Sequence, residues 1–231
     1  MTSRPPAHKK PARKRAARRS HDLATIKPRD FFEAFLVERY AEGLERAAAP
    51  PGYDLSVRVE LTGAGGGVWV LGFDDHALTV ERGHSSRRID VQVFQTVDDW
   101  AAFLRGELGG PSALVAEASR TPAPVVPLDA ASRERLRRID GTLVVSIRHF
   151  QGRDWRLGIH FGGGAARNPP DTTFSMSWLD FQSLSGAGRP ANLQALMLGG
   201  ALRIEGNFAL AGELAAIATT HIQATLARVR S

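Results

Sequence analysis

The stretch GGALRIEGNFALAGELAAI, Gly199 to Ile217, changes its pattern halfway along. Leu202 and Ile204 alternate with charged residues, which predicts a half-buried strand. Gly206 permits a sharp turn, and Asn207 is a favoured N-cap for the helix predicted to follow. A phosphate cradle would need more glycines or a P-loop Lys-Ser/Thr, and the stretch contains neither. We therefore interpret Gly-Asn as a helix cap in preference to an anion site.

Two segments further upstream resemble one another. VRVELTGAGGGVWVLGF begins at Val57, and LVVSIRHFQGRDWRLGI begins at Leu143. At an offset of 86 residues Leu61 aligns with Ile147, and Trp69 with Trp155. Both segments alternate apolar and polar residues around a glycine-containing turn, which predicts a β-hairpin in each.

The similarity continues beyond the hairpins. IDVQVFQTVDDWAAFLRG begins at Ile89, and PDTTFSMSWLDFQSLSG begins at Pro170. At an offset of 81 residues Asp90 aligns with Asp171, and Asp99 with Asp180. Each segment predicts a strand followed by a short amphipathic helix. Two copies of one supersecondary unit explain both alignments.

The copies differ at their ends. A predicted amphipathic helix with Phe32, Phe35, Leu36 and Leu44 precedes the first copy, and the shorter DAASRERLRRI, with Asp129 as a candidate cap, precedes the second. Only the second copy continues into the Gly-Asn stretch. The sheet of the first copy would therefore end early and expose an edge. The second copy is the candidate to complete that sheet.

Basic residues concentrate at the N-terminus. Residues 1–21 carry eight of the 30 Lys and Arg and no acid, so the remaining 22 basic and 24 acidic residues leave the body a formal charge of −2. We expect a disordered tail. Its candidate partners are an anionic membrane, in transient contact, and, less favoured, nucleic acid; a solvated tail without a partner is the simpler alternative.

No signature of an enzyme emerges from the sequence. The chain has no cysteine, no pair of histidines at the spacing of a helical zinc site and no G-x-S-x-G motif. We therefore predict no catalytic residue, no metal and no cofactor. No apolar run could span a membrane and no secretory signal is present, so we expect a cytoplasmic protein.

The runs DWRLGI, DTTFSMSWLDFQSL and LMLGGALRIEGNFALAGELAAI resemble the sterol carrier protein type 2 family over about residues 129–220. Through the internal repeat, the resemblance extends more weakly to about 30–108. It implies an α/β (α+β) fold in which a mixed five-stranded sheet with helices on one face encloses an apolar tunnel. The implied ligand is a hydrophobic lipid, such as a fatty acyl, sterol or isoprenoid chain, bound for transfer or presentation without catalysis.

These observations divide the chain into a tail (1–27), a degenerate sterol-carrier-like repeat (28–118), a Pro-rich linker (119–128) and a sterol-carrier-like lipid-binding domain (129–231). An accessory module that supports a lipid-biosynthetic enzyme, and nucleic-acid binding through the tail, remain the alternatives. The candidate lining residues are the apolar side chains of the last unit: Trp155, Leu157, Phe174, Met176, Phe181, Leu184, Met197, Leu198, Phe208 and Leu214. The alternative role for each of them is plain core packing.

Overall fold

The computed structural model describes residues 22–47, 52, 54–109, 130–183, 193–214 and 216. Residues 1–21 of the predicted tail, the Pro-rich linker, Asp129 and Leu184 lie outside the described residues, so the division into four segments stays a prediction. Among the described helices, none combines the length and the apolar composition that a membrane span requires.

Helices and strands follow one another in two similar series. The N-terminal half comprises α1 (Pro28–Asp30), the π-helical turn η1 (Phe31–Phe35), α2 (Leu36–Arg46), β1 (Asp54–Thr62), β2 (Gly67–Asp74), β3 (Leu78–Arg82), β4 (Val91–Thr96) and α3 (Val97–Leu104). The C-terminal half comprises α5 (Ala130–Arg138), β5 (Gly141–Phe150), β6 (Arg153–Phe161), β7 (Thr172–Ser177), α6 (Trp178–Ser183), α7 (Leu193–Leu198), β8 (Leu202–Gly206) and the helical residues 208–214.

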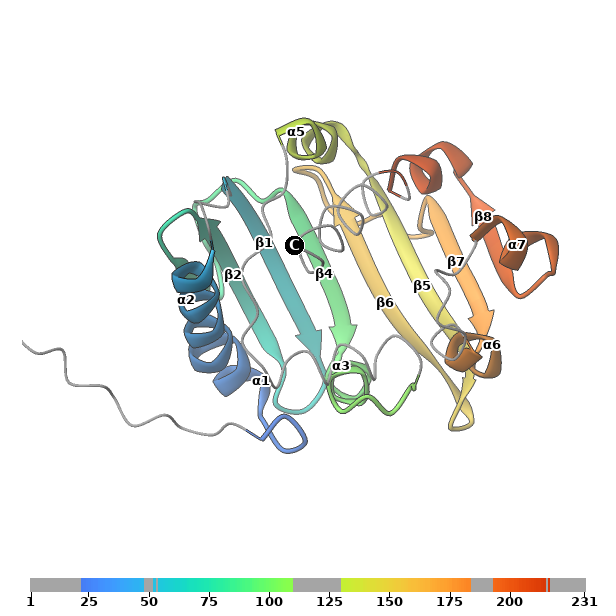
Figure 1. Cartoon of the computed structure of the whole chain (residues 1–231), viewed down its shortest axis with the longest axis horizontal. Helices are drawn as coiled ribbons and strands as arrows, with labels where there is room; N and C mark the ends of the chain where they lie inside the picture. Colours follow the sequence, from blue (N-terminus) through green and yellow to red (C-terminus); the bar gives the residue numbers. More distant parts are fainter. Residues whose placement is uncertain are drawn as a thin grey trace, which may run out of the picture.

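All eight strands form one mixed sheet in the order β3-β2-β1-β4-β6-β5-β7-β8 (Figure 1). In each half, the first strand pairs antiparallel with the second and parallel with the strand that precedes α3 or α6. β4 then pairs antiparallel with β6, from Val91 opposite Phe161 to Phe94 opposite Gly158. The second unit thus completes the open edge of the first, as the sequence indicated. The family resemblance implied a sheet of five strands, but each half contributes four. The β4–β6 pairing supplies each half with a further neighbouring strand from the other half.

Side-chain hydrogen bonds support the internal repeat. The Ser56 N–H donates to the Asp90 carboxylate at 2.9 Å, and the Thr142 N–H donates to Asp171 at 2.7 Å. Thr96 caps α3 through the Asp99 N–H, and Ser177 accepts from the Asp180 N–H at the start of α6. Ser56 and Thr142 are 86 residues apart, and each of the other equivalent residues is 81 residues from its counterpart, as in the sequence alignment.

One alignment within the repeat is wrong by two residues. Trp69 lies opposite Val59, whereas Trp155 lies opposite Ile147. Since Val145 is the counterpart of Val59, and its partner is Leu157, the structural counterpart of Trp69 is Leu157. The second hairpin is longer at its tip, where a bulge between Ile147 and Phe150 and three residues with positive φ turn the chain.

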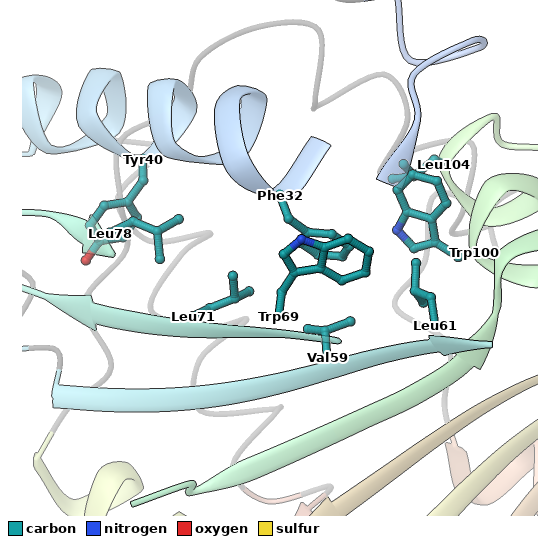
Figure 2. Packing of buried hydrophobic residues seen from close by; sticks show 9 residues of the cluster. All are labelled: Phe32, Tyr40, Val59, Leu61, Trp69, Leu71, Leu78, Trp100 and Leu104. Atoms are coloured by element: carbon teal, nitrogen blue, oxygen red, sulfur yellow. The ribbon is translucent and has the colours of Figure 1, made fainter. Parts of the chain in front are cut away.

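Helices cover one face of the sheet with three apolar clusters. In the N-terminal half, α2 and η1 pack Phe32 and Tyr40 onto Val59, Trp69 and Leu71 (Figure 2). This confirms the predicted amphipathic helix. In the C-terminal half, two further clusters lie toward opposite ends of the strands. One involves α3 and α6, and the other involves α5 and residues 208–214 (Figure 1).

The Gly-Asn stretch forms the helix cap that the sequence predicted. Gly206 has a φ of 94°, and a Cβ atom there would lie 2.1 Å from the carbonyl oxygen of Asp171. The Asn207 side-chain oxygen accepts from the N–H groups of Ala209 and Leu210 at 3.0 and 3.2 Å. The cap therefore fixes residues 208–214 directly after β8.

Candidate apolar lipid-binding face

Four apolar side chains form a row across the strands of the C-terminal half. Strand register places Leu157 beside Val145, Val145 beside Phe174, and Phe174 beside Ile204. We call these four residues the apolar row. All four are half-buried. Because neighbouring strands lie about 4.8 Å apart, the row spans about 14 Å of the helix-covered face.

Closed core flanks the apolar row toward one end of the strands. Trp155, Ile147 and Met176 occupy the next position along β6, β5 and β7. Helices α3 and α6 cover them, and Phe103 of α3 stacks on Trp155 with ring centroids 5.9 Å apart. The Trp155 indole N–H donates to the carbonyl oxygen of Asp99 at 2.7 Å, so its one polar atom is satisfied.

The other flank is closed by a separate cluster. Ile139, which follows α5, packs with Phe161 and with Leu210 of the capped helical segment. A cleft of about 430 Å³ lies at this end of the strands, and its lining mixes charged and apolar side chains. These residues are Arg135, Arg138, Ile139, Asp140, Asn207, Ala209, Leu210 and Glu213.

The sequence-predicted lining residues fall into three groups. Leu157 and Phe174 belong to the apolar row, and Leu157, like Val145, also packs against the cluster under α3 and α6. Trp155, Met176 and Phe181 pack in that cluster, and Leu214 packs in the cluster near α5. Exposed fractions of 39%, 83% and 59% place Met197, Leu198 and Phe208 at the surface. A lining role for any of these residues stays a prediction.

Two members of the apolar row, Val145 and Ile204, were not among the predicted residues. Both alternate correctly along their strands in the sequence. Only the pairing of β5 with β7, and of β7 with β8, shows that they lie next to Phe174. Phe103 was also missed as a neighbour, because it comes from the N-terminal half of the chain.

Charged groups lie around the apolar row, outside it. Asp99 is buried and forms an ion pair with Arg153, so it links α3 to the β5–β6 hairpin. Asp171 accepts from the Thr142 N–H and from Arg167, and these two bonds, in that order, hold the pKa of Asp171 below its ordinary value despite partial burial. The described residues contain no group of three or more His, Cys, Asp or Glu placed to hold a metal ion.

Comparison with known proteins finds a similarity that is confined to the C-terminal half. The model of the SCP-2 sterol transfer family matches residues 125–219. No curated protein sequence matches the chain.

Two solved structures are similar to this chain at low identity. Sterol carrier protein domain 2 of Helicoverpa armigera is 20% identical, with 62% of this chain and 94% of that chain covered and a TM-score of 0.28. A conserved hypothetical protein of Thermus thermophilus, described as possibly a sterol carrier protein, is 16% identical, with 41% and 90% covered and a TM-score of 0.28. Because both TM-scores are low, the similarity to the family rests on the match of its model to residues 125–219. Residues 125–219 are thus similar in sequence to the SCP-2 sterol transfer family.

Proposed function

We propose that the C-terminal half binds the hydrophobic chain of a lipid along the apolar row, for transfer or presentation and without catalysis. The observation that carries this proposal is the row itself: four adjacent strands each place a half-buried apolar side chain on the helix-covered face, and core clusters lie toward both ends of these strands. The family match to residues 125–219 supports the same ligand class.

Apolar burial supplies the binding energy in this proposal. Each 100 Å² of apolar surface removed from water contributes about 2.5 kcal/mol. A flexible chain suits a row that crosses strands, since successive methylene groups can follow the side chains of Leu157, Val145, Phe174 and Ile204.

The non-catalytic part of the proposal follows from the chemistry of the row. None of its four side chains can act as a nucleophile, an acid or a base. The buried carboxylate of Asp99 on the flank is engaged by Arg153 and by the Arg156 N–H.

The compartment and the role of the basic tail belong to the same proposal. A chain without cysteine suits a reducing cytoplasm. Basic residues 1–21 of the tail, which lie outside the described residues, would add transient contact with anionic membranes.

The first test is recovery of lipid with the protein, by native mass spectrometry and extraction after purification. Uptake of a fluorescent fatty acid then compares Val145→Thr with Val144→Thr. These neighbours lie on opposite faces of β5 and are both half-buried. A hydroxyl placed under an acyl chain should weaken uptake about tenfold, which corresponds to about 1.4 kcal/mol.

Val144→Thr should bind as the wild type does. Equal uptake by both variants would exclude the apolar row as the site. Absence of bound lipid, together with absence of fatty acid uptake, would overturn the proposed function.

A further inference from the structure

The N-terminal half contains a counterpart of the apolar row. Strand register places Trp69 beside Val59, and Val59 beside Val93. These three positions correspond to Leu157, Val145 and Phe174. The fourth position, which Ile204 of β8 occupies in the C-terminal half, is taken here by Ile159 of β6.

The two rows differ in how much of their surface is covered. Trp69 is 0% exposed and Val59 is 7% exposed, whereas Leu157 and Val145 are half-buried. The two rows therefore differ in burial on the first two strands of each half. At the position on the second strand, the N-terminal row has Trp69 and the C-terminal row has Leu157.

Aromatic side chains of the same chain cover the N-terminal row. Phe32 of η1 stacks on Trp69 with ring centroids 4.8 Å apart and an interplanar angle of 29°. The Trp69 indole N–H donates to the Glu33 carboxylate at 3.1 Å, so the ring is held at both its face and its edge. Figure 2 shows Phe32 descending from the helix onto Trp69 and Val59.

The covering helices also differ in length and position. Residues 28–46 are helical in the N-terminal half, where α2 packs against β3 and Phe32 of η1 packs on Trp69 of β2. The helix that precedes the C-terminal hairpin, α5, has only nine residues and packs with the cluster at one end of the strands.

We infer that the N-terminal half is a lipid-binding unit filled by its own side chains: Phe32 and Trp69 occupy the space that a lipid chain takes over the apolar row. The chain therefore binds one lipid, in its C-terminal half, and the residue at the Trp69 or Leu157 position decides whether a row is open. This inference rests on the proposed function.

The experiment exchanges that residue between the halves. Full-length wild type, Leu157→Trp and the double variant Trp69→Leu/Phe32→Ala are saturated with palmitate, and bound molecules are counted by native mass spectrometry. One palmitate is expected on the wild type, none on Leu157→Trp and two on the double variant. Circular dichroism verifies that each variant is folded.

A photoreactive diazirine fatty acid on the wild type gives a second measurement that needs no folded variant. Peptide mapping should place the label between residues 141 and 206 and leave residues 28–96 unlabelled. Two palmitates on the wild type, a folded Leu157→Trp that keeps its palmitate, or label within residues 28–96 would overturn the inference and leave lipid binding intact. Absence of palmitate from all three proteins would overturn the proposed function, and the inference with it.

Discussion

The two halves of this sheet begin from the same unit and end differently. The N-terminal half adds β3 outside β2, whereas the C-terminal half adds β8 outside β7. Each half lacks the strand that the other adds, and the β4–β6 pairing fills both vacant positions at once. A duplicated unit can therefore lose an edge strand from each copy without leaving an unpaired inner edge.

The most stringent test of this comparison concerns two equivalent aspartates. Asp99→Ala removes a buried carboxylate that binds Arg153 and the Arg156 N–H across the two halves. We expect a loss of about 3 kcal/mol of unfolding free energy, at the low end for a buried pair because Arg153 is partly exposed. Urea denaturation measures it.

Asp180→Ala is the matched control. Asp180 starts α6 as Asp99 starts α3, but its side chain accepts only from the Ser177 hydroxyl among the hydrogen bonds described. The expected loss is about 0.5 kcal/mol. Equal losses for the two variants would show that Asp99 does not link the halves.

A second test addresses the β4–β6 pairing. Gly158 lies opposite Phe94, and a Cβ atom at Gly158 would come within 1.9 Å of the Phe94 ring. Gly158→Ala should therefore cost about 2 kcal/mol through overcrowding. Adding Phe94→Leu should recover part of that loss, and a double-mutant cycle measures the recovery. Strictly additive effects would contradict close packing between the Phe94 ring and the backbone at Gly158.

The cap at Asn207 has no counterpart among the described residues of the N-terminal half. Asn207→Ala removes the acceptor for the Ala209 and Leu210 N–H groups. Thermal unfolding should show a loss of about 1 kcal/mol, while fatty acid uptake stays unchanged because the cap lies outside the apolar row. Lost uptake at unchanged stability would instead favour an anion site at this turn.

The smallest expected effect distinguishes Asp171 from Asp90. Both accept a backbone N–H from the first strand of their half, but Asp171 also binds Arg167. Since its folded-state pKa lies below the ordinary value of 3.8, its charge stabilises the fold above pH 3.8, and that contribution is lost as the pH falls through the folded-state pKa. Asp171→Asn should cost about 0.5 kcal/mol at pH 7.

The cost of Asp171→Asn should shrink toward zero in denaturation series taken below pH 3.8. A difference from the wild type that does not change with pH would indicate that the carboxylate charge contributes nothing.

Local patterns in the sequence predicted much of this fold. Alternation along Val57–Leu61 and Leu202–Ile204 identified strands, and Asn207 identified the start of a helix, because each signal involves residues close in the chain. The recurrence of Asp90 as Asp171 identified the repeat. These features depend on backbone geometry that a short segment specifies by itself.

Register and partner choice could not be predicted in the same way. The matching of Trp69 with Trp155 failed because two additional residues at the hairpin tip shift β6 relative to β5. The apolar row was only partly predicted, since Val145 and Ile204 become neighbours of Phe174 through strands that are distant in sequence. Pairing of β4 with β6 likewise depends on contacts between segments far apart in the chain.

The continuous sheet also makes the stability of each half depend on the folding of the other. If β4 and β6 separate, both halves gain an unpaired edge, so the pairing favours unfolding of the two halves together. A ligand that binds the C-terminal half would stabilise the folded chain by about 2.7 kcal/mol when its free concentration is about 100 times its dissociation constant. Under the proposed function, that stabilisation would extend to Trp69 and its aromatic neighbours, and their melting would report ligand occupancy of the C-terminal half.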